Sequence, residues 1–168
     1  TEDCRIYVGG HYDTVVDVPG ANDNASGTAL VVALAQAFVG VEGSDLVCFV
    51  GFAAEEAVGG FAGLGGSSFL VSELTASGAI AEVSAMLNLD VASGGTNTVI
   101  LIGTTDLTLT AAKIAAELDI NTRLGSLPAM TGSDHSSFQS AGVPVLFPTI
   151  FGARIHVPED NFASVEPA

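Results

Sequence analysis

The stretch LVCFVGFA at residues 46–53 decides the fold class, because it is apolar apart from Gly51 and is followed at once by Glu55 and Glu56. A short run rich in β-branched and aromatic residues is typical of a strand buried on both faces. A similar run, RIYVGG, covers residues 5–10. Buried strands of this kind belong to parallel sheets whose faces are covered by helices. We therefore expect an α/β domain with a mostly parallel central sheet.

Helices and further strands alternate along the rest of the chain. The patterns predict helices over residues 27–38, 61–74, 107–118 and 136–141, and strands over 85–91, 98–102 and 143–147. Side-chain oxygens of Asp23, Asn24 and Ser26 are candidate caps for the first helix. The second helix has the weakest pattern, because glycines crowd its first turns. We expect one three-layer α/β/α domain over residues 1–168.

The composition limits the classes of partner. Of the 168 residues, 48% are hydrophobic and 14% charged, which is typical of a globular protein and excludes a disordered chain. The 19 acidic and 4 basic side chains give a net charge of −15, which excludes nucleic acid and anionic membranes as favoured partners. Lys113 is the single lysine, so we expect adaptation to high salt, with an ordinary acidic secreted protein as the alternative.

The cysteines, the longest apolar run and the first residues of the sequence give information about where the protein is located. Cys4 and Cys48 lie in expected strands, where we expect buried free thiols, with a disulfide between them as the alternative. The longest apolar run, residues 29–39, is shorter than the roughly 20 residues that span a bilayer. No signal peptide is visible at Thr1, so we expect either processing before this residue or a fragment. A secreted protein is the expectation, and a cytoplasmic one the alternative.

Polar residues gather where the expected strands end. In parallel sheets, ligands bind beyond the carboxyl ends of the strands. Residues of this kind follow the first, second, third and last strands, and one more precedes the first helix. They are His11, Asp13, Asp23, Glu55, Glu56, Asp90 and His156. Scattered surface carboxylates would not be expected to lie on one edge, so this pattern predicts a site there.

The residue types in this set favour metal chemistry. Adjacent residues on extended backbone point in opposite directions, so one of Glu55 and Glu56 can bind a metal while the other takes a proton from water. A charge on Asp90 at the end of a buried strand is costly unless a metal pairs with it. Asp23 can bridge two cations or cap the first helix. The alternative for the glutamates is a solvated strand end.

Six ordered segments strengthen this interpretation, and together they resemble the family 28 metallopeptidases, the co-catalytic zinc aminopeptidases. The segments are GGHYDTV, PGANDNASG, FAAEE, NLD, SDHSSFQSAGVP and RIHVPED, and they extend over about residues 7–162. The resemblance is greatest to bacterial leucyl aminopeptidases and aminopeptidase Y. It implies the zinc-peptidase, phosphorylase/hydrolase-like fold, peptide substrates and a cis peptide bond between Asp23 and Asn24.

The resemblance also implies a ligand set for two zinc ions, for which Co²⁺ or Mn²⁺ are possible substitutes. Asp23 and a water would bridge the ions. One ion would also be bound by His11 and Asp90, and the other by Glu56 and His156. Glu55 would be the general base, and Asp13 would orient His11 through its second ring nitrogen.

The chain departs from the family pattern in two places. Relatives carry strands and a helix before the first histidine motif, so we expect a sheet trimmed at the N-terminus that a homo-oligomer could complete. Residues 127–130 stand where leucyl relatives have a cysteine pair. Apolar residues near the expected ligands either line a cleft for a leucine-like side chain or pack in the core. They are Val91, Phe147, Ile150, Phe151 and Ile155.

The leading hypothesis is a zinc aminopeptidase that removes N-terminal, apolar residues. Three alternatives remain: a glutaminyl-cyclase-like enzyme with one zinc, a carboxypeptidase, and a non-catalytic receptor or scaffold domain. Retention of every expected ligand and of the base favours a hydrolase.

Overall fold

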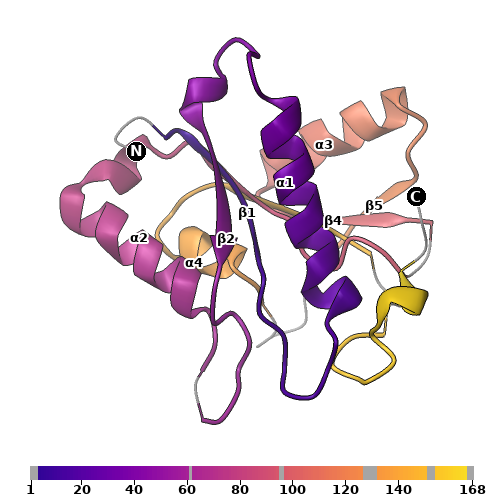
Figure 1. Ribbon diagram of the computed structural model, residues 1–168. Coiled ribbons are helices and arrows are strands. Elements are labelled where there is room, and N and C mark those ends of the chain that lie inside the picture. Colours follow the sequence, from indigo (N-terminus) through magenta and orange to yellow (C-terminus); the bar gives the residue numbers. More distant parts are fainter. Residues whose placement is uncertain (1–3, 61, 95–96, 127–131, 151–153, 166–168) are drawn as a thin grey trace.

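A central sheet of six strands carries the fold, in the order β2-β1-β3-β6-β4-β5 (Figure 1). The strands are β1 (Ile6–His11), β2 (Val47–Phe52), β3 (Ala85–Asn88), β4 (Val99–Gly103), β5 (Thr122–Leu124) and β6 (Val145–Thr149). Neighbouring strands are parallel except β4 and β6, which pair antiparallel. The expected mostly parallel sheet is confirmed. This computed structural model describes residues 4–60, 62–94, 97–126, 132–150 and 154–165.

Helices flank the sheet and complete the expected α/β architecture. They are α1 (Gly27–Ala37), α2 (Gly65–Ser77), α3 (Thr105–Glu117) and α4 (His135–Ser140). Helix α1 packs on β1 and β2, whereas α2 and α4 contact each other and α3 packs against β4 and β5 (Figure 1). Among the described helices, none combines the length and the apolar character that a membrane span requires.

The core divides between the two faces of the sheet because side chains alternate along each strand. In β1, buried Tyr7 belongs to a cluster with Met86 and Phe138 on the face covered by α2 and α4. The next residue, Val8, packs with Val31 of α1 on the opposite face. The near-continuous apolar runs of β1 and β3 thus serve two layers of core, as expected for buried parallel strands.

Four neighbouring strands bring their carboxyl ends to one edge. The strands β2, β1, β3 and β6 are mutually parallel, so residues that follow them lie on the same side of the sheet. Strand β1 ends at His11, and β3 ends two residues before Asp90. The fold therefore positions the expected site as the sequence predicts.

Some predicted bounds differ from the structure, and one strand was not predicted. Strand β3 ends at Asn88 and not at residue 91, where Val91 has a left-handed φ of +52°, and β6 spans Val145–Thr149 and not residues 143–147. Helix α2 spans Gly65–Ser77, not residues 61–74. Gly63 and Leu64 have φ angles of +83° and +58°, and this left-handed backbone cannot belong to the helix. Residue 61 lies outside the described residues. Strand β5 was not expected, because its three residues TRL are too few and too polar for a period-2 pattern, and pairing with β4 forms it.

The expectation of free thiols is wrong, because Cys4 and Cys48 form a disulfide. Cys4 directly precedes the β1 region, and Cys48 lies on the neighbouring strand β2. Parallel pairing of these strands brings the two Cα atoms to 5.7 Å, within the range that a disulfide spans. Sequence spacing alone could not show this register.

Strand β2 is an edge strand that pairs with β1 among the described strands. A homo-oligomer that adds to this edge stays a prediction.

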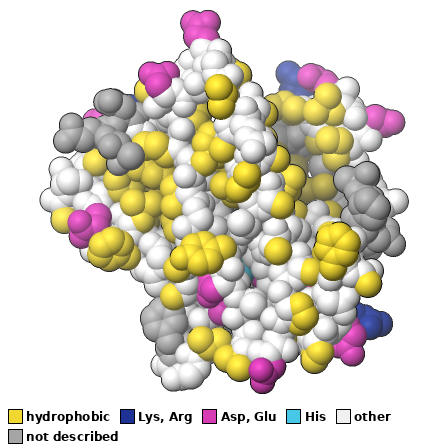
Figure 2. All heavy atoms as spheres, viewed as in Figure 1, with side chains coloured by type: hydrophobic (Ala, Val, Ile, Leu, Met, Phe, Trp, Pro, Cys, Tyr) yellow, Lys and Arg dark blue, Asp and Glu magenta, His cyan; other side chains and the backbone are white. Residues whose placement is uncertain are grey.

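Figure 2 shows acidic side chains scattered over one face of the molecule and few basic ones. The excess of acidic over basic side chains on this face agrees with the net charge of −15.

Candidate active site

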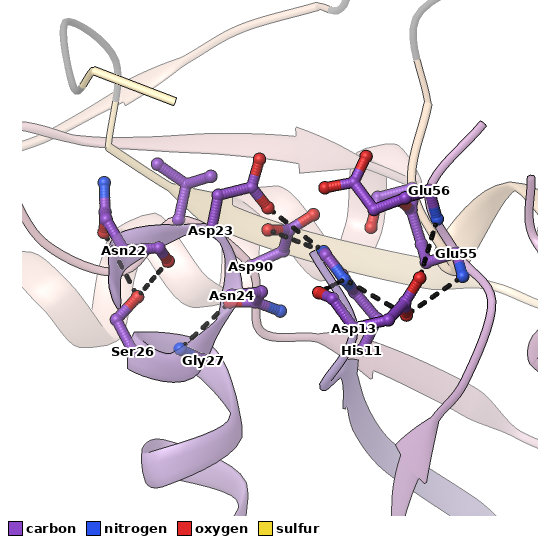
Figure 3. Close-up of polar contacts among 12 residues, drawn as sticks. His11, Asp13, Asn22, Asp23, Asn24, Ser26, Gly27, Glu55, Glu56 and Asp90 are labelled. Atoms are coloured by element: carbon purple, nitrogen blue, oxygen red, sulfur yellow. Dashed lines mark hydrogen bonds and ion pairs between the residues drawn. The ribbon is translucent and has the colours of Figure 1, made fainter. Parts of the chain in front are cut away.

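His11 lies at the centre of a buried polar cluster at the carboxyl edge of the sheet (Figure 3). Its Nε2 atom is 3.2 Å from Oδ1 of Asp23 and 3.5 Å from Oδ1 of Asp90. All three side chains are buried. The end of β1, the loop before α1 and the segment after β3 thus converge on one imidazole nitrogen.

Asp23 faces a second histidine with its other oxygen. Oδ2 of Asp23 is 3.0 Å from Nε2 of His156, which is also 3.3 Å from Oε2 of Glu56. The His156 side chain is 51% exposed, whereas Asp23 and Glu56 are buried. The Asp23 carboxylate therefore lies between two imidazoles, one at each oxygen.

The loop before α1 explains why Asp23 is free to face the histidines. Oδ1 of Asn24 accepts from the backbone N–H of Gly27, so Asn24 supplies the oxygen that caps the first turn. Nδ2 of Asn24 donates to the carbonyl of Leu89 and joins this loop to the end of β3. The capping alternative thus holds for Asn24 and not for Asp23. The Asp23–Asn24 peptide bond is cis, as the resemblance implies.

Asp13 contacts His11 differently from what we expected. Nδ1 of His11 donates to the backbone carbonyl of Asp13 at 3.1 Å, and the nearer carboxylate oxygen is 3.6 Å away. The carboxylate instead accepts from the backbone N–H groups of Glu55 and Glu56, both at 3.1 Å. The backbone of Asp13 orients the imidazole, and its side chain fixes the glutamate pair.

Unusual backbone accompanies three of these residues. Ala54 precedes Glu55 with a φ of +55°, Val91 follows Asp90 with +52°, and His156 itself has +58°. Non-glycine residues rarely adopt this left-handed region, and a β-branched valine is a clear outlier. Strain of this kind persists where the surrounding structure holds it, and it is frequent at functional sites.

The electrostatics of the cluster are those of crowded buried carboxylates. Burial lowers the pKa of His11, but hydrogen bonds with Asp23 and Asp90 outweigh this effect and raise it to about 11. Burial raises the pKa of Glu55 to about 8, and nearby carboxylates add to the rise against the charge of His11. Burial and the charge of Asp23 raise the pKa of Glu56. Extra positive charge is therefore favourable here.

The donor set fits divalent cations. Two groups of possible ligands, each with mutual distances within 4.8 Å, share Asp23: one with His11 and Asp90, the other with Glu56 and His156. A third possible group joins His11 to Glu55 and Glu56. The Oε1 atom of Glu56 is buried without a hydrogen-bond partner, and a cation would satisfy it. Imidazole and carboxylate are the mixture of ligands that zinc accepts in catalytic sites.

The residues predicted to line a substrate pocket have mixed environments. Val91 and Phe147 are buried. The ring centroids of Phe147 and His135 are 4.7 Å apart, so Phe147 is packed in the core. Ile150 is half-buried and Ile155 is 38% exposed. Phe151 lies outside the described residues. The apolar cleft stays a prediction.

His135 and Asp160 have roles in the structure that the sequence patterns did not predict. His135 lies in the SDHSSFQSAGVP segment and is buried against Phe147, and it belongs to none of the possible ligand groups found among the described residues. Asp160 was missed as an individual residue, although it ends the RIHVPED segment. It is fully buried and accepts from the backbone of Asn22 and Asp23. A charged residue in a polar loop gives no sequence signal of such burial.

Known proteins resemble this chain in sequence and in fold. It is 31% identical to aminopeptidase YwaD of Bacillus subtilis, over 91% of this chain and 29% of that protein. It is 30% identical to a probable leucine aminopeptidase of Arthroderma otae, over 97% of this chain and 49% of that protein. The solved aminopeptidase from Aneurinibacillus sp. strain AM-1 superposes with a TM-score of 0.79 at 28% identity, over 98% of this chain and 39% of that one.

The chain therefore spans about half or less of the length of these relatives. The family described as Peptidase family M28 matches residues 1–168, the whole of the sequence. This match agrees with the strand-end cluster and with the shared fold. The chain belongs to peptidase family M28.

Proposed function

We propose that this chain carries the catalytic centre of a zinc aminopeptidase that removes N-terminal, apolar residues from peptides. The observation that carries the proposal is the position of Asp23 between His11 and His156, with one carboxylate oxygen toward each imidazole. A carboxylate placed in this way can be shared by two cations. The names of the relatives support aminopeptidase activity.

Five residues would hold two zinc ions in this proposal: Asp23 as the shared ligand, His11 and Asp90 on one side, Glu56 and His156 on the other. Zinc, when bound, supplies Lewis-acid chemistry, which lowers the pKa of water and polarises a peptide carbonyl. The Asp13 carbonyl binds Nδ1 of His11, so that the Nε2 atom of His11 faces Asp23 and Asp90.

Glu55 is the proposed general base. Its carboxyl group lies beside the proposed ligand Glu56 and has a pKa of about 8, because partial burial and neighbouring carboxylates disfavour its charged form. A group with a pKa near neutrality can take a proton from water and then give it to the leaving amine. Hydrogen bonding of the Glu55 and Glu56 backbone to Asp13 holds the base and its neighbouring ligand at a fixed separation.

The disulfide supports a proposal on localisation. Disulfides persist in oxidising compartments and are rare in the reducing cytosol of most organisms. Cys4 and Cys48 are joined in the structure. We therefore infer that the protein works outside the cytoplasm, as the sequence led us to expect.

Metal analysis combined with a substrate pair tests the proposed function. We expect two zinc ions per chain, hydrolysis of leucyl-p-nitroanilide, and no hydrolysis of the N-acetylated form. Chelation is expected to abolish the activity and added zinc to restore it. One ion with cyclisation of N-terminal glutamine would favour a glutaminyl-cyclase-like enzyme. Cleavage of N-blocked peptides from the other end would favour a carboxypeptidase, and full activity after chelation would exclude metal catalysis.

A further inference from the structure

Asp160 joins two loops that each carry a proposed zinc ligand. Its Oδ1 atom accepts from the backbone N–H of Asn22 at 2.7 Å, and its Oδ2 atom accepts from that of Asp23 at 3.0 Å. Its backbone carbonyl accepts from the N–H of Ala21 at 3.2 Å. Three consecutive N–H groups of the loop before α1 are thus bound by a single residue.

The same residue is part of the loop that presents His156. The backbone N–H of Asp160 donates to the carbonyl of Val157 at 2.9 Å, which closes a turn directly after His156. His156 has a φ of +58°, a conformation that a histidine keeps only when its surroundings hold it. The turn closed by Asp160 is one of the contacts that restrain this loop.

The burial of Asp160 needs an explanation beyond loop closure. The side chain is completely buried, although the neighbouring loop already carries the carboxylate of Asp23. An additional buried carboxylate near other acids is unfavourable unless strong hydrogen bonds stabilise it. A neutral acceptor would suffice to satisfy one N–H group. A carboxylate can bind two adjacent N–H groups at once with short, charge-assisted hydrogen bonds, which fixes the direction of the backbone at Asp23.

We propose that Asp160 is a positioning residue that sets the spacing between Asp23 and His156. The inference rests on the proposed function, because these two residues are proposed zinc ligands. Asp160 contacts neither the imidazole nor the Asp23 carboxylate in the hydrogen bonds described, and acts through the backbone of both loops. Partners that orient metal ligands in this way typically change metal affinity about 10- to 100-fold when they are replaced.

The substitution Asp160→Asn tests the proposal in the full protein. Asparagine keeps the size and one acceptor oxygen, but its NH₂ group faces an N–H donor in place of the second oxygen. We expect zinc affinity, measured by competition with a chromophoric chelator, to fall about 10- to 100-fold. Glu159→Gln is the matched control, because it removes one negative charge from the adjacent, exposed position, and it should bind zinc as the wild type does.

Thermal unfolding of the metal-free proteins separates positioning from general stability. Positioning predicts a weaker zinc affinity and a smaller zinc-induced rise in Tm while the metal-free Asp160→Asn protein is still folded at the assay temperature. A lower Tm with unchanged zinc affinity would overturn the inference. If the asparagine variant does not fold, Asp160→Glu replaces it, since it keeps the charge but displaces the oxygens. Wild-type affinity in Asp160→Glu would likewise overturn the inference.

The behaviour of the wild type distinguishes this inference from the proposed function. If the wild type binds no zinc, the proposed function fails and the positioning role fails with it. If the wild type binds two ions and Asp160→Asn binds them equally well, only the positioning role is overturned.

Discussion

A carboxylate oxygen of Asp13 accepts a hydrogen bond from the backbone N–H of Glu56 at 3.1 Å. The second oxygen accepts from the N–H of Glu55, also at 3.1 Å. Asp13 lies two residues after His11, so the loops after β1 and β2 are joined directly beside the proposed ligands. Together with Asp160, this contact means that two carboxylates outside the proposed ligand set fix the backbone of residues within it.

Asp13→Asn should weaken both catalysis and folding. The amide NH₂ group would face one of the two N–H donors, so the glutamate pair would lose one acceptor and shift. We expect kcat to fall about 10- to 100-fold and the free energy of unfolding to fall by about 1–3 kcal/mol. Steady-state kinetics and urea unfolding measure the two effects. Asp17→Asn, in the same loop but exposed, should leave both unchanged.

Glu55 and Glu56 should differ in what their substitution removes. Glu55→Gln keeps the proposed ligands, so zinc content should remain at the wild-type value while kcat falls about 100- to 10,000-fold through loss of the base. Glu56→Gln should lower zinc affinity, because this carboxylate faces His156. Metal analysis beside kinetics decides the assignment. The opposite result, with zinc lost in Glu55→Gln alone, would exchange the two roles.

Loss of the disulfide should destabilise the edge of the sheet. Cys4 and Cys48 are separated by 44 residues in sequence, and the bond joins β2 to the segment before β1. Loop closure of this length is worth about 4 kcal/mol in the chain-entropy model, so Cys4→Ala/Cys48→Ala should lose about 2–4 kcal/mol of unfolding free energy. Urea unfolding measures the loss. The untreated wild type should show no thiol reactive toward an alkylating agent after denaturation, and two alkylated thiols would contradict the bond.

Salt should stabilise the fold. The net charge of −15 leaves acidic side chains to repel one another across the surface, and salt shortens the range of this repulsion from about 10 Å at 0.1 M to about 3 Å at 1 M. We expect the Tm of the metal-free protein to rise between 0.1 M and 2 M KCl. Sucrose, which stabilises without screening charge, serves as the comparison. Equal Tm values at the two salt concentrations would contradict adaptation to high salt.

His135 should make the protein sensitive to acid. Burial lowers its pKa to about 4, below the ordinary value of 6.5 that it regains on unfolding. The unfolded chain therefore binds the proton more readily between these values, and the stability conferred by neutral His135 is complete above pH 6.5 and is lost as the pH falls toward 4. The shift corresponds to about 3 kcal/mol at most.

His135→Phe isolates this effect. Phenylalanine keeps a ring against Phe147 and removes the buried, unpaired Nδ1 atom. Urea unfolding of the metal-free wild type and variant should show a difference in unfolding free energy that grows in favour of the variant from pH 7 to pH 4. A difference that does not change with pH would show that His135 does not titrate as described.

The layers of the fold were predictable because they depend on local patterns. The apolar runs that became β1 and β2 are too continuous for an amphipathic helix and too short for a buried one. Strand β5 and the start of α2 were not predictable in this way. Pairing with β4 creates β5. The left-handed backbone at Leu64 means that α2 begins only at Gly65. Both depend on contacts or conformations that residue type does not specify.

The grouping of the site residues was predictable to the same extent. Strand ends, residue types and the resemblance predicted that His11, Asp23 and Asp90 would meet, and the structure brings them together. Which group of each residue makes a contact was not predictable. The Asp13 carbonyl, and not its carboxylate, accepts from His11, because the carboxylate accepts from the backbone N–H groups of Glu55 and Glu56 instead.

The amino-acid order by itself thus determined the sheet, the edge at which the polar residues gather and the kind of chemistry they suit. Hydrophobic periodicity and strand ends are local properties, because they depend on residues that are close together in the sequence. The tertiary structure alone decided that Cys4 meets Cys48 and that Asp160 is buried against the Asp23 loop. Those contacts join residues more than forty positions apart, and only the register and packing of the folded chain bring such residues within reach of each other.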